Sequence, residues 1–274
     1  LGAKAPWPSL LHPTDCPTHP CRCQSDLAAV VALEKSPTCP PEEWTASLVH
    51  KAPLGLDSGH AGRGGNVEII DIKTMFGTWP KRRIDLSPQE LVAALRAAGI
   101  SRAITCASSA ILYEGRSGNE ETWQASSQCP ELIPAATWDP RSYLAAEQPT
   151  ARLREMGMRI FRFHNRLQGY SLELYCVRKI LAELARLKMP CIVDAVSLED
   201  AYRIARFSYE FDLDVICTGL GYSFEAEVIA LAQDFPRFYC DAGRLTGPDG
   251  IALFCRHVGS HRLVYGSDYP FDAI

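Results

Sequence analysis

Residues 67–77 (Val-Glu-Ile-Ile-Asp-Ile-Lys-Thr-Met-Phe-Gly) carry charged side chains at a spacing that could do chemistry. The run predicts a strand that ends in a glycine turn, and two-residue alternation places Ile69, Asp71, Lys73 and Met75 on one face. A lysine in an enclosed apolar site can become a nucleophile when its pKa is lowered. Beside inward-facing carboxylates it forms an ion pair instead, and we expect the ion pair here.

Charged side chains also end several later apolar runs, where strands of an α/β fold would present them at one edge. Asp268 could act as a general base, and Arg162 with His164 could bind a substrate carboxylate. The catalytic candidates are Asp268, Lys73 and Asp194; the substrate-binding candidates are His164, Arg162 and Asp71.

Each candidate also has a structural interpretation. Asp268 could anchor the last turn, Asp71 could accept hydrogen bonds from backbone amides, and His164 could be an interior histidine whose hydrogen bonds are satisfied. Lys73 could pair with Asp71, Asp194 or Asp268, and Met75 is expected to pack. These alternatives stay open at the level of sequence.

The elements that must position these residues alternate between strand and helix from Val67 onward. Eight strands at regular intervals predict an α/β fold of the (β/α)8 TIM-barrel type; an open doubly wound sheet is the second choice. The expected strands are 67–75, 102–108, 132–138, 158–164, 190–195, 213–218, 237–242 and 262–267. The expected helices are 87–98, 119–128, 143–156, 172–188, 198–211, 223–234 and 248–258. The sequence ends at Ile274, so no eighth outer helix is expected within it.

The part from residue 67 to 274 resembles the amidohydrolase-related superfamily, whose metal-dependent hydrolases and decarboxylases are TIM barrels. Gly-Ser-Asp-Tyr-Pro at 266–270 is similar to the strand-8 Gly-Ser-Asp-x-Pro of that family, and this implies a metal-binding or general-base role for Asp268. Residues 71–75 (Asp-Ile-Lys-Thr-Met), at the end of the first strand, are similar to the family's Asp-x-His-x-His, whose two histidines bind the metal.

The sequence departs from the family pattern at most metal positions. Lys73 and Met75 stand where the resemblance implies histidines, Asp194 replaces a strand-5 histidine, and Gly219 replaces a strand-6 histidine. An ammonium repels a dication, and a thioether is a poor ligand for zinc or manganese. The resemblance therefore indicates a degenerate member with no cofactor in the barrel.

Residues 1–66 form a Pro/Cys-rich N-terminal arm with one short helix expected at 26–35. Its cysteines could hold a structural zinc, form disulfides or remain free thiols. The candidate metal ligands there are Cys16, Cys21, Cys23 and Cys39. We expect helix 26–35 to pack on the barrel near its first and last strands; a helix beyond Ile274 or another subunit are the alternatives.

Composition excludes some partners. The 274 residues are 47% hydrophobic with a net charge of −4 and a pI near 6.0, which gives no electrostatic reason to bind nucleic acid. No apolar run approaches membrane-spanning length, and the start lacks a signal-peptide pattern, so we expect a cytoplasmic protein.

Three functions compete. The first is a non-catalytic or scaffold subunit of a homo- or hetero-oligomer. The second is a metal-independent hydrolase or decarboxylase of a small carboxylic substrate, and the third uses a metal rebuilt on Asp194, Asp268 and His164. Under the first, the Lys73 ammonium should lie within ion-pair reach of Asp194 or Asp268.

Overall fold

The computed structural model describes residues 68–147, 149–221 and 224–272. These form one curled sheet of nine strands in the order β2-β1-β3-β4-β5-β6-β7-β8-β9. Every neighbouring pair is parallel except β1 with β2. The strands are β1 (Ile70–Trp79), β2 (Ile84–Leu86), β3 (Arg102–Ala107), β4 (Leu132–Ala136), β5 (Ile160–Arg162), β6 (Cys191–Asp194), β7 (Val215–Thr218), β8 (Phe238–Asp241) and β9 (Leu263–Val264).

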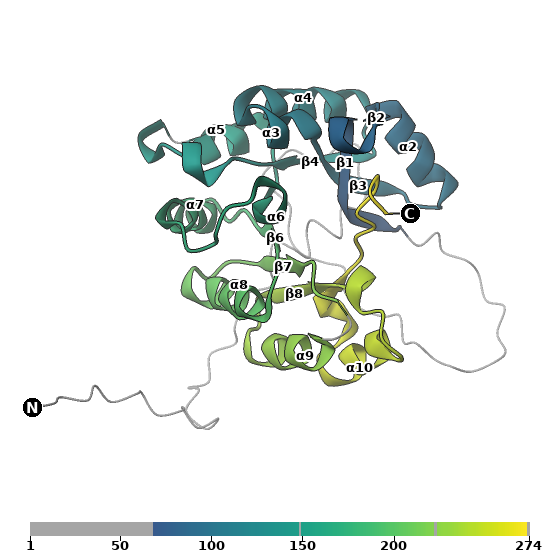
Figure 1. Ribbon diagram of the computed structural model, residues 1–274, viewed down its shortest axis with the longest axis vertical. Coiled ribbons are helices and arrows are strands. Elements are labelled where there is room, and N and C mark those ends of the chain that lie inside the picture. Colours follow the sequence, from purple (N-terminus) through teal and green to yellow (C-terminus); the bar gives the residue numbers. More distant parts are fainter. Residues whose placement is uncertain (1–67, 148, 222–223, 273–274) are drawn as a thin grey trace, which may run out of the picture.

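Helices follow the strands along the outside of the sheet (Figure 1). The longer ones are α2 (Pro88–Ala97), α4 (Gly115–Gln128), α5 (Pro149–Met156), α7 (Tyr175–Arg186), α8 (Leu198–Glu210), α9 (Glu225–Asp234) and α10 (Gly250–His257). Two short helices, α3 (Ser108–Leu112) and α6 (Asn165–Gln168), directly follow β3 and β5. All eight expected strands and all seven expected helices are therefore present, with shifted ends.

The chain after β9 closes the curl onto β1. The Ile72 N–H donates to the Tyr265 carbonyl at 2.8 Å, and the Met75 N–H donates to the Tyr269 carbonyl at 3.0 Å. These bonds join the two ends of the parallel part of the sheet, which makes a TIM barrel. After β9 the described residues, to Asp272, form no further helix. The expected helix at 26–35 lies outside the described residues.

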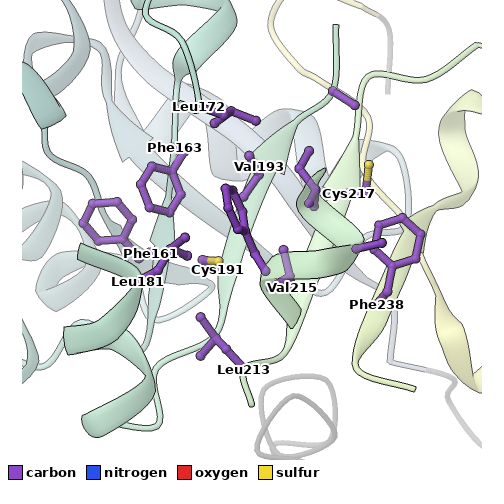
Figure 2. Close-up of a cluster of buried hydrophobic side chains, with 14 of the residues drawn as sticks. Phe161, Phe163, Leu172, Leu181, Cys191, Val193, Leu213, Val215, Cys217 and Phe238 are labelled. Carbon is purple, nitrogen blue, oxygen red and sulfur yellow. The ribbon is translucent and has the colours of Figure 1, made fainter. Parts of the chain in front are cut away.

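Side chains from all eight parallel strands meet in one apolar cluster, which is the barrel interior. Strands β1, β3 and β6 contribute Ile72, Ile104 and Ile192, for example. Alternate residues face the helices in a second cluster (Figure 2), where Phe161, Val193 and Cys217 pack beneath the outer layer. Hydrophobic packing of both sheet faces accounts for the uniformly apolar strands.

The cysteines of the strands behave as small apolar residues, as their sequence context predicts. Cys106 lies in the interior cluster, and Cys191, Cys217 and Cys240 lie beneath the helices. The seven cysteines of the described part are free thiols. No helix of the described residues is long and apolar enough to cross a membrane.

Candidate site at the barrel centre

A bulge in β1 changes which of its side chains point inward. Asp71 pairs with Ala103 of β3, but Thr74 pairs with Thr105, so β1 holds one extra residue at this point. The expected common face of Ile69, Asp71, Lys73 and Met75 is therefore wrong. Ile70, Ile72 and Met75 share the interior cluster, while Ile69 is 42% exposed. A bulge has no signature in period-two alternation, which is why the sequence did not reveal it.

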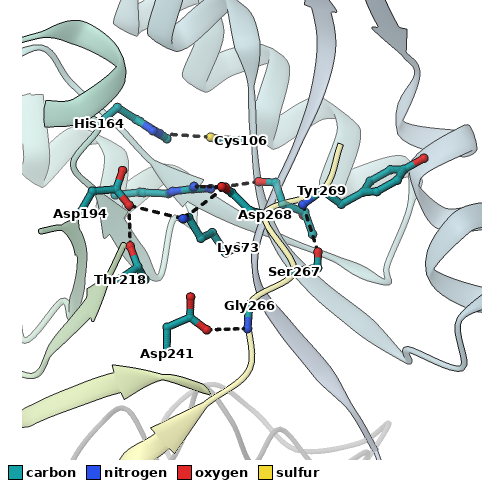
Figure 3. Close-up of polar contacts among 12 residues, drawn as sticks. Lys73, Cys106, His164, Asp194, Thr218, Asp241, Gly266, Ser267, Asp268 and Tyr269 are labelled. Atoms are coloured by element: carbon teal, nitrogen blue, oxygen red, sulfur yellow. Dashed lines mark hydrogen bonds and ion pairs between the residues drawn. The ribbon is translucent and has the colours of Figure 1, made fainter. Parts of the chain in front are cut away.

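Lys73 lies between two carboxylates at the centre of the barrel (Figure 3). Its Nζ is 3.5 Å from Oδ1 of Asp194 and 3.2 Å from Oδ1 of Asp268. The lysine side chain is 3% exposed. The expected ion pair is thus confirmed, with both proposed partners at once.

Asp194 is the last residue of β6, and hydrogen bonds and the Lys73 ion pair fix its position. Its Oδ1 accepts a hydrogen bond from the Thr218 hydroxyl, and its backbone carbonyl accepts one from the Asn165 amide at 2.7 Å. Burial alone raises the pKa of this carboxyl, but Lys73, Arg162 and the Thr218 hydroxyl together hold it below its ordinary value. Asp194 is therefore an anion at neutral pH.

Arg162 and His164 both point into the interior, as expected from their alternation. Arg162 lies 3.8 Å from Asp268 through Nη2 and donates through Nη1 to the Thr74 carbonyl at 3.2 Å. Burial is the main cause that lowers the pKa of His164 well below 6.5, and Arg162 and Lys73 lower it further. His164 is therefore neutral at neutral pH.

The imidazole of His164 faces a cysteine that sequence reasoning assigned to packing. Its Nε2 is 3.4 Å from Sγ of Cys106. Burial raises the pKa of that thiol to about 11, so the pair stays neutral instead of forming a reactive thiolate with an imidazolium. Cys106 lies near the carboxyl end of its strand, and this position was the one signal in the sequence that could have placed it beside His164.

The Asp71 carboxylate connects β1 to the segment after β9 through hydrogen bonds. Its Oδ1 accepts from the backbone N–H of Lys73 at 2.9 Å and of Ser267 at 3.1 Å. The side chain is fully buried. Its contacts therefore match the structural interpretation, and its role in substrate binding stays a prediction.

The residues at the centre differ from the metal-binding set that the family pattern implies. Lys73 fills the space between the two carboxylates, and Met75 packs in the apolar cluster. Among the described residues, no group of three or more His, Cys, Asp or Glu side chains is arranged to hold a metal ion. The candidate zinc ligands Cys16, Cys21, Cys23 and Cys39 lie outside the described residues.

Gly219 gives a backbone reason for the same conclusion. Its φ is +93°, and a Cβ added there would lie 2.7 Å from the Ala195 carbonyl oxygen. That separation is too short for a real Cβ, so the backbone would have to shift before any side chain could be placed. The histidine implied at this position has no room in this chain.

Apolar side chains lie against the barrel interior beyond the charged centre. Ile111 belongs to the interior cluster, and Trp79 and Phe271 pack against it. Trp79 and Phe271 meet edge to face with ring centroids 5.0 Å apart, and Arg82 lies over the Phe271 ring at 4.8 Å. The Asp268 side chain keeps 17% exposure, and the other charged groups of the centre keep less.

The strand order, the closure of β9 onto β1 and the polar residues at the strand ends define a TIM barrel with a candidate site at its centre. The amidohydrolase family model matches residues 60–273, and the chain belongs to the amidohydrolase family. The search of curated proteins finds no significant relative.

Solved structures share the fold at low sequence identity. One is a 5-carboxyvanillate decarboxylase from Novosphingobium aromaticivorans with bound manganese (TM-score 0.60, 14% identity, 77% of this chain and 90% of that one). Another is a probable 2-pyrone-4,6-dicarboxylic acid hydrolase from Acinetobacter baumannii with citric acid bound (TM-score 0.55, 16%, 74% and 85%). A third is a 2,6-dihydroxybenzoate decarboxylase from Rhizobium (TM-score 0.54, 12%, 75% and 88%).

Proposed function

We propose that this chain is an amidohydrolase-family barrel without a catalytic metal, and that it works as a non-catalytic subunit of a larger assembly. The observation that carries the proposal is the Lys73 ammonium between Asp194 and Asp268. A divalent cation placed among these carboxylates would meet a fixed positive charge at close range. Electrostatic repulsion in a buried site opposes that arrangement strongly.

The protonation states give little support to the alternative, a metal-independent hydrolase or decarboxylase. A general base works best when its pKa is near the operating pH, whereas Asp194 has a lowered pKa and His164 has a pKa well below 6.5. Cys106, with its pKa raised to about 11, is a poor nucleophile. Of the candidates, Asp268 keeps the most contact with solvent.

The test combines metal analysis with a search for turnover. Elemental analysis should find no metal in the barrel of the purified protein. Because the arm cysteines could bind zinc, the matched control replaces Cys16, Cys21, Cys23 and Cys39 with serine; any zinc of the parent protein should disappear with them. Near-stoichiometric zinc or manganese that survives in this variant and is lost in Asp268→Asn would overturn the proposal.

The fold neighbours suggest the substrates for the turnover assay. Their names identify ring compounds that bear carboxylates: 5-carboxyvanillate, 2,6-dihydroxybenzoate and 2-pyrone-4,6-dicarboxylate. We expect no turnover of these compounds, with or without added manganese or zinc. Turnover that Asp268→Asn abolishes would favour the enzyme alternative, with Asp268 as base and Arg162 and His164 holding the small carboxylic substrate.

Exposed apolar side chains support the expectation of a protein partner. Tyr113, Leu144, Leu167 and Val196 are each at least 41% exposed, and they follow β3, β4, β5 and β6. Exposed apolar side chains are typical of interaction surfaces when they form one contiguous patch, and these four follow successive strands of the barrel. Light scattering should give a mass above one chain, and Tyr113→Glu with Val196→Glu should lower it; an unchanged monomeric mass would contradict an assembly of identical chains.

The free thiols of the described part support a reducing, cytoplasmic location for this subunit. The packing of helix 26–35 near the first and last strands remains a proposal, as does a structural zinc on the arm cysteines, for which disulfides and free thiols are the alternatives. Neither nucleic acid nor a membrane is proposed as a partner.

A further inference from the structure

We propose that the barrel centre is a cation-binding site that the chain fills with its own lysine, and that the Lys73 ammonium is its resident cation. This inference concerns the same site as the proposed function and rests on its metal-free centre. The ligands are Asp194, at the end of β6, and Asp268, after β9, with Lys73 on β1 between them (Figure 3). Lys73 thus links three strands of the barrel that are distant in sequence.

The carboxylates need a cation at this place. Asp194 and Asp268 both lie within 3.5 Å of the same ammonium nitrogen, so without it two largely buried anions would face each other. Buried like charges repel and favour uptake of protons. Arg162 is a second cation at this place, 3.8 Å from Asp268, but the Lys73 ammonium lies closer to Asp268, at 3.2 Å.

The segment after β9 leaves room for the lysine stem, and this is an independent observation. A Cβ at Gly266 would lie 2.8 Å from Cβ of Lys73 and 3.3 Å from Cγ1 of Ile72. The first separation is closer than real Cβ atoms approach, so a larger residue would push this segment away from β1. The Gly266 N–H also donates to Asp241 at 3.2 Å, which fixes the glycine in this position. The absence of a side chain at Gly266 therefore allows this segment to lie close to β1 at Lys73.

The experiment is chemical rescue of Lys73→Ala by methylammonium. Removing the buried cation should lower the Tm by roughly 10 °C, because two largely buried carboxylates lose their nearest positive charge. Methylammonium resembles the lysine head that is removed, and at about 100 mM it should restore about 3 °C if its Kd is about 20 mM. Sodium chloride and the bulkier tetramethylammonium chloride at the same concentration serve as salt and size controls.

Met75→Ala is the matched variant. Met75 is a buried, unbranched side chain on the same strand, and its removal opens an apolar gap without freeing a carboxylate. Methylammonium should not raise its Tm beyond the effect of sodium chloride. Equal rescue of both variants, or a Lys73→Ala protein as stable as the parent, would contradict the cation site.

If Lys73→Ala does not fold, a double substitution takes its place. Lys73→Met with Asp194→Asn removes one charge of each sign, so its Tm should lie well above the value expected from the sum of the two single losses, or it alone should fold. A Tm that equals the sum, or a double variant that also fails to fold, would contradict the inference. Turnover without metal would refute the proposed function but not this cation site. Normal stability of Lys73→Ala would refute the cation site but not the proposed function.

Discussion

His164 shows how burial decides what a polar residue in this barrel can do. The side chain is fully buried beside Cys106, and its pKa lies well below 6.5. The unfolded chain therefore takes up a proton that the folded chain does not. Stability is at its full value above pH 6.5 and falls as the pH decreases below it, by up to about 1.4 kcal/mol per pH unit for one proton.

This gives a prediction for His164→Gln, which cannot take up that proton. Between pH 6.5 and 5.5 the parent protein should lose about 1 kcal/mol more of its unfolding free energy than the variant does. Urea unfolding at both pH values measures the difference, and contributions from the other histidines cancel in the comparison. Parallel losses in the two proteins would mean that His164 is protonated in the folded state.

Gly219 carries a second prediction at the residue scale. Gly219→Ala should lower the unfolding free energy by about 1–3 kcal/mol, because alanine is strained at a φ of +93° and its Cβ meets the Ala195 carbonyl. Gly221→Ala is the control, since nothing lies within 4 Å of a Cβ at Gly221. Equal urea midpoints for the two variants would show that the backbone at 219 adapts at little cost.

At the scale of the element, Asp71 joins β1 to the last strand. Asp71→Ala should cost about 2–4 kcal/mol of unfolding free energy, because the N–H groups of Lys73 and Ser267 lose their acceptor. Asp71→Asn keeps an acceptor oxygen of similar shape and should cost less in the same urea titration. If asparagine proves as harmful as alanine, the charge of Asp71 matters more than its hydrogen bonds.

The longer elements followed closely from local sequence, whereas β2 and the short helices α3 and α6 were not predicted. Ser87 caps α2 with a local sequence motif: its hydroxyl accepts from the Glu90 N–H, and the Glu90 carboxylate accepts from the Ser87 N–H. The hairpin partner β2 was missed because Gly77 was interpreted as a turn. Gly77 instead continues β1 with a φ of +98°, and Ser108 lies where its Cβ would be.

At the scale of the whole molecule, we predict that histidine substitutions at the family's metal positions do not restore metal binding. Lys73→His, Met75→His and Gly219→His together restore three of the four family histidines and leave Asp194 in place, yet a side chain at 219 requires the backbone to move. Manganese and zinc titrations of this triple variant by calorimetry should match those of the Lys73→His/Met75→His double variant. Tight stoichiometric binding by the triple variant alone would show that the barrel can still accommodate the site.

The sequence by itself determined the order of strands and helices, the barrel class and the positions where the family pattern departs from metal binding. These properties depend on alternation, capping residues and short motifs, which are local. Only the tertiary structure decided that Lys73 pairs with both Asp194 and Asp268, that Cys106 faces His164, and that the β1 bulge turns Ile70 and Ile72 inward. Closure of the barrel brings together residues from separate strands, and burial then determines which of them are charged. A local sequence pattern predicts neither the distance between residues of different strands nor their burial.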